Sequence, residues 1–111
     1  MKLSQCAIDA AELIEHGGWT QGAEARDANG NKVSALSDFA CSWCAMGALR
    51  RVADSTRLTG ADKIAVIAGL PLTPILSLHP LATFNDDRDR TKEEVINLLR
   101  EAGTKLKERG E

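Results

Sequence analysis

The sequence predicts a mainly α-helical fold in a single small domain, residues 1–111, with four to five short helices and one small β-hairpin or ordered loop after the first helix. Apolar residues recur at helical spacing in four segments, whereas one segment carries a hairpin signal, an Asn-Gly pair. The length suits a single hydrophobic core. Aromatic residues make up only 4%, which indicates an aliphatic core whose alanines let helices approach closely.

The first helix is predicted over residues 3–16. Its apolar residues share one face and its acidic residues another, and Gly17-Gly18 supplies a stop. The next stretch, residues 19–36, is rich in short polar residues and contains the Asn29-Gly30 turn. We therefore expect a small hairpin or an ordered loop there.

A second helix is expected from a cap at Ser37 or Asp38 through about residue 54. On such a helix Cys41 and Cys44 would share a face within an apolar seam. The segment "CSWCAMGAL" is therefore interpreted first as a buried helical seam.

Glycine is costly inside a helix, so Gly47 predicts the close approach of another backbone, either the last helix or the hairpin. We expect Cys44, Gly47 and Ala48 to be buried. The predicted contacts of this seam are on the last helix: Val95, Leu98 and Leu99.

Two short helices are predicted next. Thr59 would cap a helix that ends at Gly69, and Thr73 with Pro74 would begin one or two further turns that end at Pro80. The last helix has the clearest signal, because Thr91 and Glu94 form a capping box before an apolar stripe.

Three kinds of cysteine chemistry compete with the buried seam. A zinc site needs two ligands beyond Cys41 and Cys44, and a thioredoxin-like pair needs a strand before its first cysteine. The other candidate zinc ligands are scattered singly: Cys6, His16 and His79. A nucleophilic set of Cys41 or Cys44 with His79 and Asn85 has the chain order of papain-like hydrolases. Inert, reduced thiols are favoured, and neither a metal nor a cofactor is expected.

The segment "FNDDRDRTKEE" does not have the spacing of a calcium loop, because Arg88 and Arg90 interrupt its acidic residues. Short polar side chains of this kind commonly bond nearby backbone. We therefore predict a structural role for Phe84, Asn85 and Asp86, in which the two polar side chains bond backbone near the hairpin or the last helix and Phe84 is anchored below them.

Composition excludes some partners. The net charge is −2 without a basic stripe, which argues against nucleic acid. No apolar run reaches the roughly 20 residues that span a bilayer, and the first residues lack the apolar segment of a signal peptide. We expect a soluble cytoplasmic protein without a membrane partner.

Several blocks of the sequence together resemble a known family. They begin with Trp19-Thr20-Gln21-Gly22 and end with Thr91, Glu94 and Val95; between them stand residues 25–30, 43–49 and 84–86. This pattern is similar to a family of short bacterial and bacteriophage proteins classed only as a domain of unknown function. The resemblance implies a common fold and a phage or mobile-element setting, with Cys44 matching the family's cysteine and Cys41 lying outside the pattern.

Two functions remain as hypotheses. In the first, the chain is a small non-enzymatic protein that binds and modulates or inhibits a host protein, with homodimerisation left open. Its docking surface would be the hairpin and its flanks, through Trp19, Arg26, Asp27 and Asn29, because loops on a rigid scaffold commonly carry binding residues. In the second, the chain is a minimal cysteine-dependent hydrolase or transferase that uses Cys44.

Overall fold

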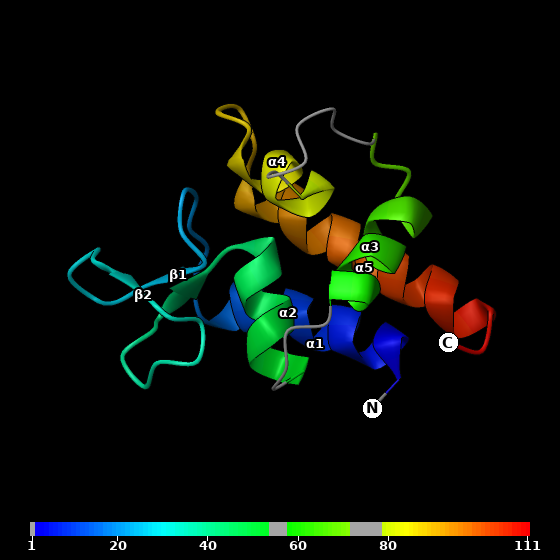
Figure 1. The fold of residues 1–111 in the computed structure, drawn as a ribbon, viewed down its shortest axis with the longest axis horizontal. Coiled ribbons are helices and arrows are strands. Elements are labelled where there is room, and N and C mark those ends of the chain that lie inside the picture. The colour runs from blue at the N-terminus through cyan, green and yellow to red at the C-terminus, as the bar shows by residue number, and fades with distance from the viewer. Residues whose placement is uncertain (1, 54–57, 72–78) are drawn as a thin grey trace.

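The computed structural model describes residues 2–53, 58–71 and 79–111 (Figure 1). The predicted mainly α class is confirmed, because the described residues form five helices and a small antiparallel sheet. The elements, in chain order, are α1 (Leu3–His16), β1 (Ala25–Arg26), β2 (Lys32–Val33), β3 (Ser42–Trp43), α2 (Ala45–Ala53), α3 (Leu58–Ile67), α4 (Pro80–Asp86) and α5 (Lys92–Glu108). Among the described helices, none has both the length and the apolar character that crossing a membrane would require.

Helices α1 and α5 form the centre of the molecule and run antiparallel along each other (Figure 1). At one end Lys92 Nζ donates to the carbonyl of Glu15, and at the other Ser4 N donates to the carbonyl of Glu111. The helices approach closely because Gly103 lacks a side chain: a Cβ there would lie 2.7 Å from Cγ1 of Ile8. The bounds of α1 agree with the prediction.

The hairpin prediction is also confirmed. Strand β1 pairs antiparallel with β2 on one side and with β3 on the other, giving the order β2-β1-β3. In the hairpin turn the carboxylate of Asp27 accepts hydrogen bonds from the backbone N–H groups of Asn29 and Asn31, both at 2.9 Å. Gly30 has a φ of +83°, a left-handed conformation that glycine adopts without strain.

The prediction for the start of the second helix is wrong. Residues 42–43 form β3, and α2 begins only at Ala45. The reason is that backbone N–H groups expected in a helix donate to carbonyls distant in the sequence instead: Cys41 N donates to Arg26 O and Trp43 N to Gly18 O. Cys41 and Cys44 therefore do not share a helix face.

The buried state of Cys44, Gly47 and Ala48 is confirmed, but their predicted packing against α5 is wrong. Helix α2 packs mainly against α1, because α1 already occupies much of the apolar face of α5. The backbone that approaches Gly47 belongs to the hairpin segment: a Cβ at Gly47 would lie 1.9 Å from the carbonyl oxygen of Glu24.

Helix α3 ends as predicted, with Gly69 at a φ of +75°. The prediction that Thr59 caps this helix is wrong, because α3 already begins one residue earlier, at Leu58. The turn expected at Thr73 and Pro74 lies outside the described residues.

Helix α4 was not expected. Pro80 starts this helix instead of ending a turn, since proline is favoured in the first helical turn, and His79 Nδ1 accepts a hydrogen bond from Leu81 N. The segment Phe84-Asn85-Asp86 is thus the last turn of α4. The capping box of Thr91 and Glu94 at the start of α5 is confirmed.

Candidate functional site

Asn85 connects three parts of the chain. Its side chain is completely buried, and its Oδ1 accepts hydrogen bonds from Trp19 Nε1 at 2.8 Å and from Ala45 N at 3.0 Å. Its Nδ2 donates to the carbonyl of Thr20 at 3.0 Å and to Oδ1 of Asp86 at 2.9 Å. The amide therefore joins the segment before the hairpin, the first turn of α2 and α4.

Two further hydrogen bonds hold the segment before the hairpin against α4. Gln21 Nε2 donates to the carbonyl of Asn85 at 2.9 Å, and Gly22 N donates to Oδ1 of Asp86 at 3.1 Å. The side chains of Asn85 and Asp86 thus contact backbone near the hairpin, at Thr20 and Gly22, as the sequence predicts, whereas the Gln21 side chain contacts the backbone of Asn85 itself. The structural role expected of Asn85 and Asp86 agrees with this geometry.

Cys44 caps α2. Its Sγ accepts a hydrogen bond from Gly47 N at 3.2 Å, in the way a serine or threonine oxygen caps a helix. Burial raises the pKa of the Cys44 thiol, although the N–H groups of Gly47 and Met46 act in the opposite direction. Cys41 is exposed, and its thiol lies 3.6 Å from the carbonyl oxygen of Arg26.

The nucleophilic set considered from the sequence is not assembled by the described contacts. His79 Nε2 lies 2.7 Å from Oδ1 of Asp62, and its Nδ1 accepts from Leu81 N, so both ring nitrogens have partners on α3 and α4. Both polar atoms of the Asn85 amide are likewise engaged. In the part of the chain that the structure describes, no cluster of three or more His, Cys, Asp or Glu residues could hold a metal ion.

Most side chains that the sequence suggests for binding also organise the hairpin. Trp19 is half-buried and donates to Asn85. The guanidinium of Arg26 makes three hydrogen bonds of 2.8–3.1 Å, to the Thr20 hydroxyl and to two carbonyls, those of Gln21 and Gly30. Asn29, in contrast, is exposed in the turn. Contact of these residues with a partner stays a prediction.

The sequence interpretation missed the loop between β2 and β3, residues 34–40, which we call the double-turn loop. It consists of two consecutive turns and presents two of the exposed large apolar side chains: Leu36, 40% exposed, and Phe39, 78% exposed. The signal was the repeat of serine at positions 34 and 37, since serine at the start of a turn commonly bonds the backbone two residues on.

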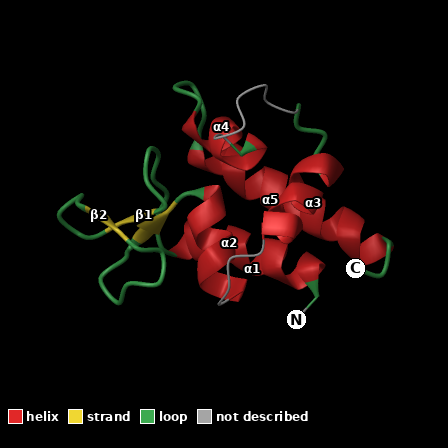
Figure 2. Ribbon diagram, in the orientation of Figure 1, coloured by secondary structure: helices red, strands yellow, loops and turns green. Residues whose placement is uncertain are grey.

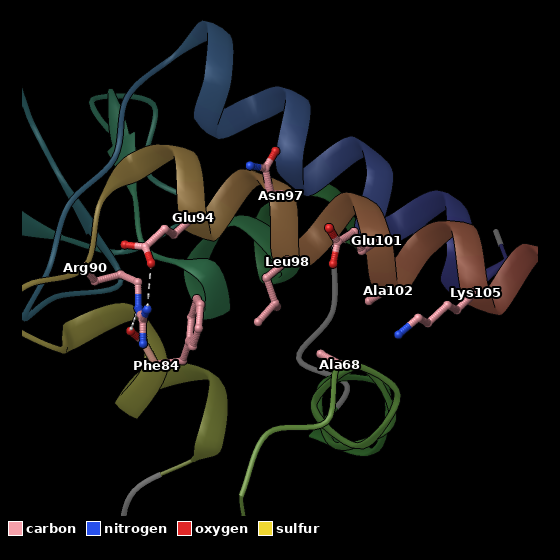
Figure 3. Close-up of a pocket in the computed structure, with 9 residues that line it drawn as sticks. All are labelled: Ala68, Phe84, Arg90, Glu94, Asn97, Leu98, Glu101, Ala102 and Lys105. Atoms are coloured by element: carbon pink, nitrogen blue, oxygen red, sulfur yellow. Dashed lines mark hydrogen bonds and ion pairs between the residues drawn. The ribbon is translucent and has the colours of Figure 1, made fainter.

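A separate groove of about 280 Å³ lies between α5, α4 and the end of α3 (Figure 3). The guanidinium of Arg90 lies over the Phe84 ring, 3.5 Å from its centroid, and its Nε donates to the carbonyl of Phe84. The floor is apolar at Leu98 and Ala102, whereas both acidic and basic side chains stand at the rim. These two contacts of Arg90 hold the half-buried Phe84 ring at one end of the groove.

Comparison with known proteins places this architecture in a family. The model of a family of unknown function, DUF6197, matches residues 2–105. The chain belongs to this family. The predicted membership of a family of unknown function is thereby confirmed, and the DUF6197 match extends over nearly the whole chain without assigning it an activity. No curated protein and no solved structure matches it significantly.

Proposed function

We propose that this chain is a small non-enzymatic module that binds another protein in the cytoplasm. The resemblance of its sequence blocks to short bacterial and bacteriophage proteins supports a phage or mobile-element origin. In that setting the target is a protein of the host, whose activity the module modulates or inhibits.

The observation that carries this proposal is the construction of the sheet end of the molecule. The three strands and their loops project to one side of the helical body, as Figure 2 shows. Hydrogen bonds from Asn85, Gln21 and Arg26 hold this projection in one geometry. A projection held in this way is suited to recognition, because a preorganised surface loses less entropy on binding.

The alternative, a hydrolase or transferase that uses Cys44, has less support from the geometry. An activated cysteine is accessible and has a lowered pKa, whereas Cys44 is buried and its pKa is raised by that burial. Its sulfur is engaged in capping α2, and His79 is paired with Asp62.

The test is affinity capture of a host protein by the tagged full chain, followed by titration calorimetry with the two purified proteins. The control is the double variant Cys41→Ser/Cys44→Ser, in which the serine at position 44 keeps a helix cap. We expect this variant to bind as tightly as the unchanged chain. Loss of binding in the folded double variant would favour the thiol chemistry, and failure to capture any partner would count against the module.

Arg26→Glu is a poor binding test, because it would remove three hydrogen bonds that shape the hairpin. Asn29→Arg is cleaner, since the Asn29 side chain is exposed in the turn. If the hairpin turn contacts the partner, this variant should bind more weakly with an unchanged melting temperature.

A further inference from the structure

The double-turn loop repeats one small structural unit. In the first turn Ser37 N donates to Ser34 O at 3.0 Å, and the Ser34 hydroxyl accepts from Leu36 N at 3.2 Å. In the second turn Ala40 N donates to Ser37 O at 3.2 Å, and the Ser37 hydroxyl accepts from Phe39 N at 3.1 Å. Leu36 and Phe39 are therefore equivalent positions, each the third residue of a serine-stabilised turn.

Side chains of other elements also hold the backbone of the loop in place. Arg51 on α2 donates through Nη1 to the carbonyls of Ala35 at 3.1 Å and Ser37 at 2.9 Å, and its guanidinium lies over the Trp43 ring. Trp43 Nε1 also donates to the carbonyl of Ala35 at 3.2 Å, and Oε1 of Glu24 accepts from Ala35 N at 2.8 Å. Ala35 is completely buried by these contacts.

This anchoring does not serve to bury the two apolar side chains of the loop. Ala35 points inward, whereas Phe39 remains 78% exposed and Leu36 40% exposed. The backbone that carries Phe39 is preorganised by these hydrogen bonds, so little backbone entropy is lost when the ring enters a pocket. Aromatic side chains of this kind dominate the energetics of many interfaces.

The charge of the loop indicates the chemistry of the partner. Asp38, exposed and directly before Phe39, is the only charged residue in residues 34–40. Anionic membranes and nucleic acids attract basic surfaces, so a carboxylate beside the ring disfavours both. A protein pocket with a basic rim is complementary to this pair.

We propose that the double-turn loop is the principal contact of this module, and that Phe39 inserts into an apolar pocket on a different protein, with Asp38 facing a lysine or arginine at the pocket rim. This inference rests on the proposed protein-binding function and specifies the kind of partner surface. The sequence-predicted residues around Arg26 then support the neighbouring strands, and the loop makes the contact.

The experiment uses the full chain with the photo-crosslinking residue benzoylphenylalanine at position 39. Val66 supplies a matched control, because it is another exposed large apolar residue, 68% exposed, and lies on α3. We expect irradiation in host cells to link position 39 to one protein and position 66 to none. Equal labelling at both positions would overturn the proposal.

Affinity measurements then use the crosslinked protein in purified form. Phe39→Ser should raise Kd about tenfold or more, the range of an interface hot spot, while Val66→Ser should leave Kd unchanged. Asp38→Asn should reduce the weakening of binding by added salt, because it removes the screened charge pair. Circular dichroism should show that all three variants stay folded, since each changes an exposed side chain.

Other outcomes separate this inference from the proposed function. A captured partner that binds Phe39→Ser as tightly as the unchanged chain would overturn the loop contact and leave the binding module intact. Absence of any partner would overturn both. Two outcomes would overturn the choice of partner. They are self-association of the chain in sedimentation and binding of the chain to phosphatidylglycerol vesicles, in either case abolished by Phe39→Ser.

Discussion

At the scale of single residues, Gly47 illustrates how backbone proximity can outweigh helix propensity. In a helix interior alanine is normally more stable than glycine by about 1 kcal/mol. A Cβ at position 47, however, would lie 1.9 Å from the carbonyl oxygen of Glu24, so the hairpin segment and α2 would have to separate. The usual gain from alanine should therefore become a loss.

We predict that Gly47→Ala lowers the free energy of unfolding by roughly 1–3 kcal/mol, the usual cost of overpacking. Chemical denaturation would measure it. Gly103→Ala is the comparison: its Cβ would lie 2.7 Å from the Ile8 side chain and 3.1 Å from the carbonyl oxygen of Ser4, farther than the 1.9 Å at Gly47, so the loss should be smaller. A stabilised Gly47→Ala variant would show that the segment before β1 is free to shift.

The cysteines should differ in reactivity because their surroundings differ. Cys41 is exposed, whereas burial raises the pKa of Cys44 and lowers its thiolate fraction at any given pH. We predict that iodoacetamide at neutral pH modifies the folded chain at Cys41 alone, and that unfolding makes Cys44 and Cys6 accessible. Peptide mass spectrometry would locate the label. Rapid labelling of Cys44 in the folded chain would contradict this assignment.

Asn85 should be sensitive even to an isosteric change. Asn85→Asp keeps an acceptor for Trp19 Nε1 and Ala45 N, but it loses the Nδ2 donor that faces the carbonyl of Thr20 and the carboxylate of Asp86. A charge would then be buried beside two acceptors, and protonation would restore a donor. The folded-state pKa of the introduced carboxyl should therefore be raised.

We predict that Asn85→Asp destabilises the fold at neutral pH by roughly 1–3 kcal/mol or more. The stability lost should be partly regained as the pH falls through the raised pKa, and urea unfolding over a pH series would measure this. Asp86→Ala should cost less, because the Asp86 side chain is exposed. If the stability that Asn85→Asp loses relative to the unchanged chain did not vary with pH, the buried-charge explanation would be wrong.

At the scale of elements, the start of α5 was predictable because its signal is local. The Thr91–Glu94 pair lies within one helical turn, and both reciprocal hydrogen bonds form. The hydrogen bond from Thr91 N is the main reason that the pKa of Glu94 is lowered from its ordinary value of 4.5. A lowered folded-state pKa means that Glu94 stabilises the fold above its unfolded pKa and loses this effect as the pH falls through the folded value.

Thr91→Ala should reduce stability by about 0.5–2 kcal/mol, the range for loss of an N-cap side chain. Glu94→Gln keeps an acceptor for Thr91 N, so at neutral pH its effect should be small. Below pH 4.5 the unchanged chain should lose stability more steeply than Glu94→Gln, because the variant has no carboxylate to protonate there. Parallel stability curves for the two chains would show that the capping box does not couple to pH.

Other elements were set by contacts distant in sequence, and the sequence did not reveal them. Residues 37–44 fit a helical pattern, but the pairing of Cys41 with Arg26 and of Trp43 with Gly18 makes the last part of this stretch a strand. The sequence does not predict helix α4, because a proline at position 80 indicates a stop as readily as the first helical turn that it occupies. The structural role of Asn85 was expected from its residue type, whereas its partners Trp19 and Ala45 were not.

The sequence predicts the approximate location of the candidate contact surface but not the residues that form it. Sequence reasoning placed it on the hairpin because residues 19–33 add little to helical burial, and the double-turn loop directly follows that stretch. Arg51 fixes this loop through the carbonyls of Ala35 and Ser37, which lie sixteen and fourteen residues before it in the chain. Helical periodicity instead assigns residues 37–39 to the start of a helix.

At the scale of the whole molecule, the helical body and the sheet end are stabilised by different means. Helices α1 and α5 bury a continuous apolar face, with Ala10, Ile14 and Leu99 completely inaccessible. The sheet end adds only Ala25, Ala35 and Trp43 to the buried core and is held in addition by polar contacts through Asn85 and Arg51. Regions with few apolar contacts open at lower free energy than the core does.

We predict that native-state hydrogen exchange separates these two parts. The amides of Asp27 and Cys41, which pair within the sheet end, should exchange through a lower-energy opening than those of Ala10 and Leu99. Asn85→Ala should widen this difference, since it removes the amide that holds the sheet end on α2 and α4 while leaving the α1–α5 face intact. Equal loss of protection at all four amides would mean instead that the sheet and helices unfold together, and that Asn85 stabilises the entire fold.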